Sequence, residues 1–296
     1  MKKIYILLSI ILITYGCQTK SFKGNKSLIM NSNEIINDLV LSIGGDFIET
    51  NIAIRKGIDP HTYSANERDI IRITDSSLII YNGGGLEGRL EWALSKIGNI
   101  TPAISIIQNI PQEDLIYKDD KVNPHIWHDP VLWSKATVFI TESLVEMNKA
   151  NEQVYFMNED IMLYSLNQLD KYIKERVKDI PQSKRIIVTE HDAFAYFGKA
   201  YGFETLSLQK ISTHTEVTLA TINDLAELLI EKNVDTLFFE ATVSDRNIRL
   251  LQSSLKAKGH NVKIGGTLYS ETLGDKHSYI DMMHHNVDTI VKALKK

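Results

Sequence analysis

The chain has 296 residues, of which 43% are hydrophobic and 24% are charged, a composition typical of a globular protein long enough for two domains. Its formal net charge is −4 and it has no basic stripe, which argues against a nucleic acid partner. Cys17 is the one cysteine, so an internal disulfide is excluded.

The first residues have the pattern of a signal peptide. A basic start at residues 1–3 precedes an almost wholly apolar run at residues 4–13. That run is too short to cross a bilayer as a helix, which takes about 20 residues. Cys17 follows a glycine just after the run, the position of a lipidated cysteine. We therefore expect a signal peptide over residues 1–16 and a lipid-anchored tether over residues 17–27. The alternative is an ordinary cleaved signal in which the cysteine has no role.

Beyond the leader, short apolar strands alternate with amphipathic helices. Apolar runs that end in a loop or a polar residue predict buried strands at residues 77–81, 184–189 and 236–239. Helical periodicity between them predicts an α/β protein with mainly parallel sheets and helical crossovers. Ligands of such sheets bind beyond the carboxyl ends of the strands, where His191 and Glu240 fall. The helical patterns cover residues 33–43, 130–148 and 219–232.

One segment interrupts this alternation. Residues 151–178 contain neither glycine nor proline, and Pro181 ends the segment. A helix of this length spans about 40 Å, more than a crossover within one sheet requires. We expect a rigid linking helix over residues 151–180 between an N-terminal lobe (28–150) and a C-terminal lobe (181–296). A kinked pair of ordinary helices is the alternative. The apolar positions at helical spacing are Met157, Ile161, Tyr164, Leu169, Tyr172 and Ile173.

Three segments offer a histidine in a loop-like setting, and a fourth offers a carboxylate. His61 follows Asp-Pro, and His125 lies within Asn-Pro-His-Ile-Trp. His191 follows a predicted strand, and Glu271 stands near the C-terminus. Two of the four precede the predicted linking helix and two follow it. They can bind one ion only if the fold gathers them between the lobes, so the pattern predicts a metal site there.

The donor set limits the metal and leaves several functions open. Three imidazoles and one carboxylate suit zinc or a transition metal ion, because calcium and magnesium prefer more oxygen ligands. Protons compete with metal for the histidine nitrogens, so metal affinity should fall on acidification, by as many as about three decades per pH unit well below the pKa values of all three histidines.

A zinc hydrolase with Glu271 as general base would use the same residues. A third hypothesis is that the protein is a surface adhesin.

The other histidines have simpler explanations. His128 precedes Asp129 and Pro130, which suit the N-cap and the first position of the helix predicted from residue 130, so His128 is not expected to be a ligand. The surroundings of the remaining isolated histidines are polar and predict solvated side chains; these are His214, His260 and His277.

Taken together, the motifs resemble the metal-binding solute-binding lipoproteins of ABC transporters for zinc and manganese, whose two lobes are joined by one long helix. Each motif alone is common, but their order and number are specific. The matching segments include Asp-Pro-His-Thr-Tyr, Asn-Pro-His-Ile-Trp and His-Asp-Ala-Phe-Ala-Tyr-Phe; in full they lie at residues 43–46, 59–63, 81–83, 86–88, 123–127, 191–197, 211–213, 239–246, 268–270 and 283–286.

The resemblance implies a ligand set. It assigns His61, His125 and His191 as ligands, and it places Glu271 where members commonly carry aspartate. Asn123 likewise stands where aspartate often precedes the Pro-His pair. Residues 112–121 are acidic and lack histidine. The histidine-rich loop of many zinc-dedicated members is therefore missing there, which favours manganese or a mixed manganese and zinc carrier.

The resemblance also implies a mechanism of capture and delivery outside the cytoplasm. One divalent ion, Mn²⁺ or Zn²⁺ with Fe²⁺ as a further candidate, would be carried by a monomer anchored through Cys17. The protein would deliver the ion to an ABC permease. The chain has no phosphate-binding loop, so the ATPase that energises transport must be a separate polypeptide. Because a long helix resists bending, the lobes should move little on release.

Overall fold

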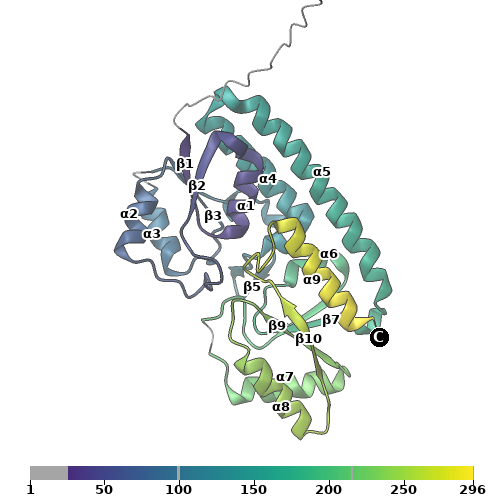
Figure 1. Ribbon diagram of the computed structural model, residues 1–296. Helices are drawn as coiled ribbons and strands as arrows, with labels where there is room; N and C mark the ends of the chain where they lie inside the picture. The colour runs from purple at the N-terminus through teal and green to yellow at the C-terminus, as the bar shows by residue number, and fades with distance from the viewer. Residues whose placement is uncertain (1–25, 99–100, 215, 296) are drawn as a thin grey trace, which may run out of the picture.

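A computed structural model describes residues 26–98, 101–214 and 216–295 of the chain. These residues form two α/β lobes joined by one long helix, as the sequence predicts (Figure 1). The predicted signal peptide, Cys17 and most of the predicted tether lie outside the described residues. Every helix in the described part is too short or too polar to cross a membrane.

The N-terminal lobe is built on a four-stranded parallel sheet in the order β2-β1-β3-β4. The predicted apolar strand is β3, all of whose residues are buried. The strands are β1 (Ser27–Asn31), β2 (Ile48–Ile52), β3 (Leu78–Tyr81) and β4 (Ala103–Ser105). The helices are α1 (Glu34–Gly44), α2 (Glu67–Thr74), α3 (Arg89–Ile97) and α4 (Pro130–Met147). The side chain of Asp129 caps α4 and Pro130 is its first residue, as predicted.

The C-terminal lobe contains two parallel strand pairs, with β7 lying next to β9. The two predicted strands are β7 and β9. The strands are β7 (Ile186–Thr189), β8 (Glu204–Ser207), β9 (Thr236–Glu240) and β10 (Lys263–Leu268). The helices are α6 (Ala195–Tyr201), α7 (Leu219–Glu231), α8 (Arg246–Ala257) and α9 (Tyr279–Leu294). A small antiparallel hairpin of β5 (Tyr117–Lys118) and β6 (Lys121–Val122) lies between the lobes (Figure 1).

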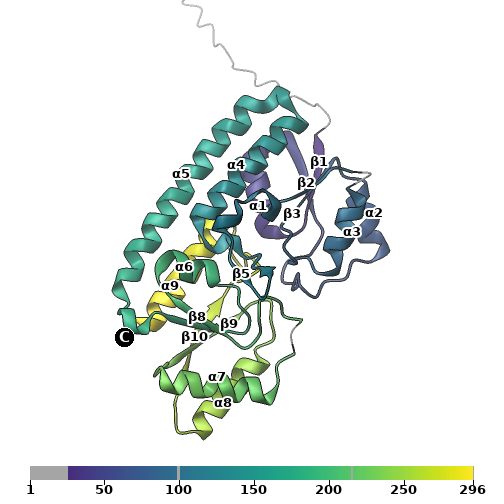
Figure 2. The ribbon, with the colours of Figure 1, turned by 180° about the vertical axis from the view of Figure 1, so that it is seen from behind.

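The linking segment is one helix, α5 (Glu152–Arg176), which continues into a 3₁₀ turn at Val177–Asp179. At 1.5 Å per residue it is about 38 Å long, and it runs along one side of both lobes (Figure 2). It packs against α1 and α4 of the first lobe and α9 of the second. Apolar residues of both lobes form one continuous core with it. This shared core adds a second reason to expect only small movements of the lobes.

The buried face of α5 differs in part from the apolar stripe in the sequence. Leu169 and Ile173 are buried as expected, but Met157, Ile161 and Tyr164 are 55%, 59% and 67% exposed. A different row of side chains, on another face of α5, packs against the neighbouring helices instead. That row contains Tyr155, Met162, Leu166, Leu169 and Ile173.

Two isoleucines of α5 give a matched test of this packing. Ile173 is fully buried and Ile161 is 59% exposed. Ile173→Ala should lower the free energy of unfolding by about 2–5 kcal/mol, because it leaves a cavity in the shared core. Ile161→Ala should change it by less than about 0.5 kcal/mol. Urea denaturation of the metal-free protein measures both, and similar losses would contradict the assigned face.

Candidate metal centre

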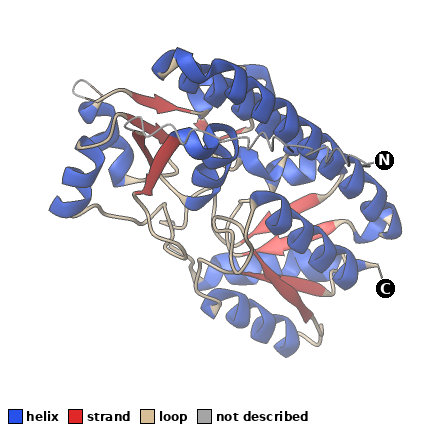
Figure 3. Ribbon diagram, turned by 45° about the horizontal axis from the view of Figure 1, so that its top comes forward, coloured by secondary structure: helices blue, strands red, loops and turns tan. Residues whose placement is uncertain are grey.

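Loops of both lobes gather in the space between the lobes (Figure 3). Four side chains carried by these loops meet there. They are His61, His125, His191 and Glu271, and none is more than 4% exposed. Each offers one ligand atom, and these atoms lie within 4.8 Å of one another. The structure therefore brings together the four residues that the sequence nominates.

Each lobe provides two of the four. His61 lies in the loop between β2 and α2, and His125 immediately precedes the 3₁₀ turn Ile126–His128 that leads into α4. His191 follows β7 and Glu271 follows β10. Both C-lobe residues thus stand beyond the carboxyl ends of parallel strands, the expected place for ligand-binding residues.

The donor atoms surround a common point. Oε1 of Glu271 lies 2.8 Å from Nε2 of His61, 3.2 Å from Nε2 of His125 and 3.3 Å from Nε2 of His191. Nε2 of His125 lies 3.2 Å from that of His61 and 3.3 Å from that of His191. These five of the six donor–donor distances are near the edge of a regular tetrahedron of about 3.3 Å, whose centre lies about 2.0 Å from each corner, the length of a zinc–nitrogen or zinc–oxygen bond. A cation at this centre would contact all four atoms at once.

His125 is oriented by Asn123. Nδ1 of the imidazole lies 2.8 Å from the amide oxygen of Asn123, which also accepts a hydrogen bond from the His125 backbone N–H at 3.1 Å. With its proton on Nδ1, the ring presents the Nε2 lone pair to the centre. The amide nitrogen of Asn123 donates to the backbone carbonyl of Asp192 at 2.9 Å. An aspartate could accept from His125 but could not make this second bond to the other lobe.

His191 is oriented by Glu240. This glutamate is the last residue of β9, so it too lies at the carboxyl end of a parallel strand. One carboxylate oxygen lies 2.8 Å from Nδ1 of His191, and the other accepts the His191 backbone N–H at 2.9 Å. The sequence placed Glu240 at a strand end but did not reveal its contact with His191. The contact joins two chain segments 49 residues apart, which no local pattern discloses.

The charges in the site are coupled. Burial opposes protonation of His191, but the carboxylates of Glu240 and Glu271 outweigh it and hold the pKa of His191 well above its usual value. Burial also opposes ionisation of Glu271, but His61 and His191 outweigh it and hold the pKa of Glu271 well below its usual value. For His125, burial dominates and keeps its pKa well below that of a free imidazole. The site thus contains an ionised carboxylate and a neutral His125, both ready to bind a cation.

A buried glutamate supports the loop that carries His125. Glu87 accepts hydrogen bonds from the hydroxyl of Ser32 and the backbone N–H of Asn82, both at 2.7 Å. Asn82 in turn donates its amide to the carbonyl of Pro124 at 3.0 Å, directly before His125. Burial raises the pKa of Glu87 to about 7. Asn82 and Glu87 lie in two of the sequence motifs, but the motifs alone indicate no role for either residue.

His128 lies outside the cluster. Its Nε2 is 3.0 Å from the backbone carbonyl of Ser270, to which Trp127 also donates its indole N–H at 2.8 Å. Burial lowers the pKa of His128 to about 3, so the ring is neutral. Both side chains therefore contact the backbone carbonyl of Ser270, and the indole of Trp127 alone can satisfy that carbonyl.

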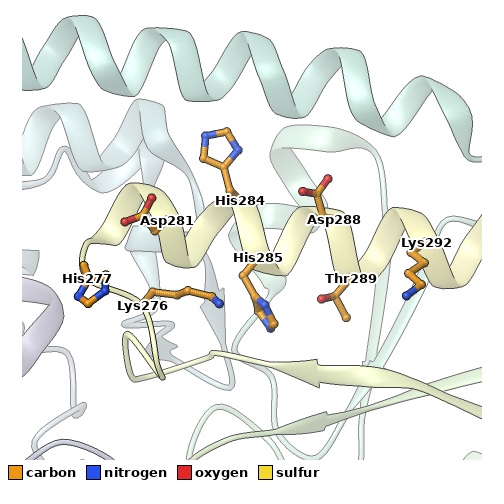
Figure 4. Close-up of a pocket in the computed structure, with 8 residues that line it drawn as sticks. All are labelled: Lys276, His277, Asp281, His284, His285, Asp288, Thr289 and Lys292. Carbon is orange, nitrogen blue, oxygen red and sulfur yellow. The ribbon is translucent and has the colours of Figure 1, made fainter.

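Other histidines do not form a second centre in the described part of the chain. Three line a shallow depression along α9 (Figure 4), where His284 points toward α5 and His285 points the other way. His284 packs on Tyr172 with ring centroids 4.3 Å apart, and His285 stacks on Tyr269 at 4.4 Å.

His260, expected to be solvated, is instead half-buried, with Nε2 2.6 Å from a backbone carbonyl. The other two histidines in this group, His214 and His277, are exposed as expected.

Two substitutions distinguish the cluster from its neighbour. His125→Ala should abolish tight binding of a zinc ion, because it removes a central donor. His128→Ala should leave affinity almost unchanged while lowering the free energy of unfolding by about 1–3 kcal/mol, the cost of a lost buried hydrogen bond. Calorimetric titration with zinc measures the first effect and denaturation the second. Equal loss of affinity in both variants would contradict the ligand assignment.

Comparison with known proteins agrees with this architecture. The chain is 35% identical over 266 residues to the manganese-binding lipoprotein MntA of Bacillus subtilis, covering 88% of this chain and 87% of the relative. It is 29% identical over 320 residues to the metal ABC transporter substrate-binding lipoprotein FimA of Streptococcus parasanguinis, covering all of both chains.

A solved structure has the same fold. The periplasmic zinc-binding protein TroA of Treponema pallidum superimposes with a TM-score of 0.88 and 31% identity, over 91% of this chain and 99% of that chain. Residues 29–293 match the family described as ZnuA, zinc-uptake complex component A, periplasmic. The chain therefore belongs to this family of metal-uptake components.

Proposed function

We propose that the protein is an extracytoplasmic receptor that captures one divalent transition metal ion, manganese or zinc, and delivers it to an ABC permease powered by a separate ATPase. A lipid on Cys17 would hold the receptor at the membrane, as a monomer. The observation that carries the proposal is the convergence of three Nε2 atoms and Oε1 of Glu271 on one point. The relatives with the same architecture are named for manganese, zinc and ABC transport.

The position of the site suits transported cargo. Its donors come from loops of both lobes, so an ion can enter or leave through small shifts of these loops. A catalytic zinc keeps one position open for water. Here Glu271 contributes the fourth donor, with Oε1 at 2.8–3.3 Å from three imidazole nitrogens. A carboxylate in that position acts as a ligand rather than a general base, which favours a carrier over a zinc hydrolase.

The donor set is compatible with both metals that the relatives' names give. Three imidazoles favour zinc by the Irving–Williams order, and the carboxylate suits manganese. The second carboxylate oxygen of Glu271 lies 3.4 Å from the hydroxyl of Thr242. A turn of Glu271 about its last bond would let both oxygens bind, which gives the larger manganese ion an additional ligand. Fe²⁺ is a further candidate on the same chemistry.

The receptor function can be tested on protein purified from its native envelope. Metal analysis should find about one manganese or zinc ion per chain, and His125→Ala protein should contain almost none. The protein should not hydrolyse esters, peptides or phosphates when loaded with zinc. Turnover of any of these that is lost in His125→Ala would favour the hydrolase instead.

Metal affinity should fall on acidification. The raised pKa of His191 means that the metal-free protein holds a proton there near neutral pH, and a bound ion must displace it. Affinity should therefore fall by at least about one decade per pH unit between pH 7.5 and 5. The slope should stay below the three decades that three ordinary histidines would give, because the lowered pKa of His125 keeps that ring neutral. Titration of zinc affinity over this interval measures the slope, and a flat profile would contradict the site.

A further inference from the structure

His61 is held differently from the other two histidines of the cluster. Nδ1 of His125 and Nδ1 of His191 each lie 2.8 Å from an acceptor, the amide oxygen of Asn123 and the carboxylate of Glu240. Nδ1 of His61 is buried and has neither a hydrogen bond nor an ion pair among the described residues. Nδ1 of His191 also lacks a hydrogen bond of good geometry, but its contact with the Glu240 carboxylate is an ion pair. The ring of His61 can therefore turn away from the centre without breaking a bond at its outer nitrogen.

His61 is also the cluster member that faces the solvent route. A cleft of about 770 Å³ opens between the lobes, and of the four donors it is lined by His61 alone. Its walls include Gly84 and Gly85 from the first lobe and residues 210–212 from the second. An ion that leaves through this cleft passes His61 first.

One carboxylate ties the His61 loop to the opposite lobe. Oδ1 of Asp59 accepts the backbone N–H of His61 at 2.9 Å, and Oδ2 accepts the hydroxyl of Thr213 at 2.6 Å. The segment that carries Thr213 is itself fixed to the C-terminal lobe. Gln209 donates its amide to the carbonyl of Thr213 at 2.8 Å and its backbone N–H to the carbonyl of Glu190 at 2.7 Å, beside His191.

We propose that the bond between Asp59 and Thr213 is a latch that holds His61 over the ion, and that His61 is the first ligand to leave during release. Asp59 and Thr213 are thus positioning residues that set the release rate. The inference rests on the proposed metal-binding function. It predicts that breaking the latch speeds loss of metal, while the three other donors remain in place.

The latch can be tested with zinc-loaded full-length protein mixed with an excess of a chromophoric chelator in a stopped-flow instrument. Thr213→Val removes the hydroxyl and keeps the side-chain size, so zinc should leave about tenfold faster, the effect of losing a hydrogen bond to a charged group. Thr213→Ser keeps the hydroxyl and should restore a rate within about twofold of the parent protein. Thr62→Val is the matched control, since Thr62 is exposed on the same loop and its hydroxyl lies 3.4 Å from the carbonyl of Asp59.

A second variant separates the latch from a general loss of stability. Asp59→Ala should also speed release, and adding Thr213→Val to it should give little further increase, because the carboxylate that accepts from Thr213 is already absent. Additive effects would overturn the latch, as would equal rates in Thr213→Val and Thr213→Ser or an unchanged rate in Thr213→Val. If the parent protein does not bind one zinc ion, the proposed function fails and the latch fails with it. If the parent binds zinc and Thr213→Val releases it at the parent rate, only the latch is rejected.

Discussion

The structure depends on a buried carboxylate surrounded by imidazoles. Oε1 of Glu271 lies 2.8 Å from His61, 3.2 Å from His125 and 3.3 Å from His191, with the residue only 4% exposed. Burying a charge is unfavourable unless it is paired. In the metal-free protein the proton on His191 supplies part of that pairing. A divalent ion would supply more, because it would contact the carboxylate and all three lone pairs together. The arrangement is therefore easier to explain as a cation site than as a means of stabilising the fold.

The framework around the site limits movement to its loops. The lobes share one apolar core, to which α5 contributes along its length. Hydrogen bonds also cross between the lobes: Glu34 accepts the backbone N–H of Leu273 at 2.9 Å, and the hydroxyl of Tyr279 donates to the carbonyl of Trp127 at 2.7 Å. Such contacts oppose a large hinge opening. Release through a shift of the His61 loop needs fewer of these contacts to break than a separation of the lobes.

Some parts of this architecture could be predicted from sequence, and others could not. The strand at Leu78–Tyr81 and the helix α5 were predictable because their signals are local: an unbroken apolar run, and a long segment without glycine or proline. The four donors were predictable because each stands in a recognisable motif. The supports of the donors were not, since the pairing of Glu240 with His191 depends on how distant segments meet. The orientation of α5 was missed for a similar reason. Its apolar residues form more than one stripe, and only the neighbouring helices decide which stripe is buried.

The central claim is that one ion binds at the point shared by the four donor atoms. Anomalous diffraction from crystals of the zinc-loaded protein, measured on both sides of the zinc absorption edge, tests it directly. The account predicts one strong peak about 2.0–2.2 Å from Nε2 of His61, His125 and His191 and from a carboxylate oxygen of Glu271. A principal peak elsewhere, such as beside His284 and His285 on α9, would contradict it. So would an ion in the cluster that leaves any of the four residues unbound.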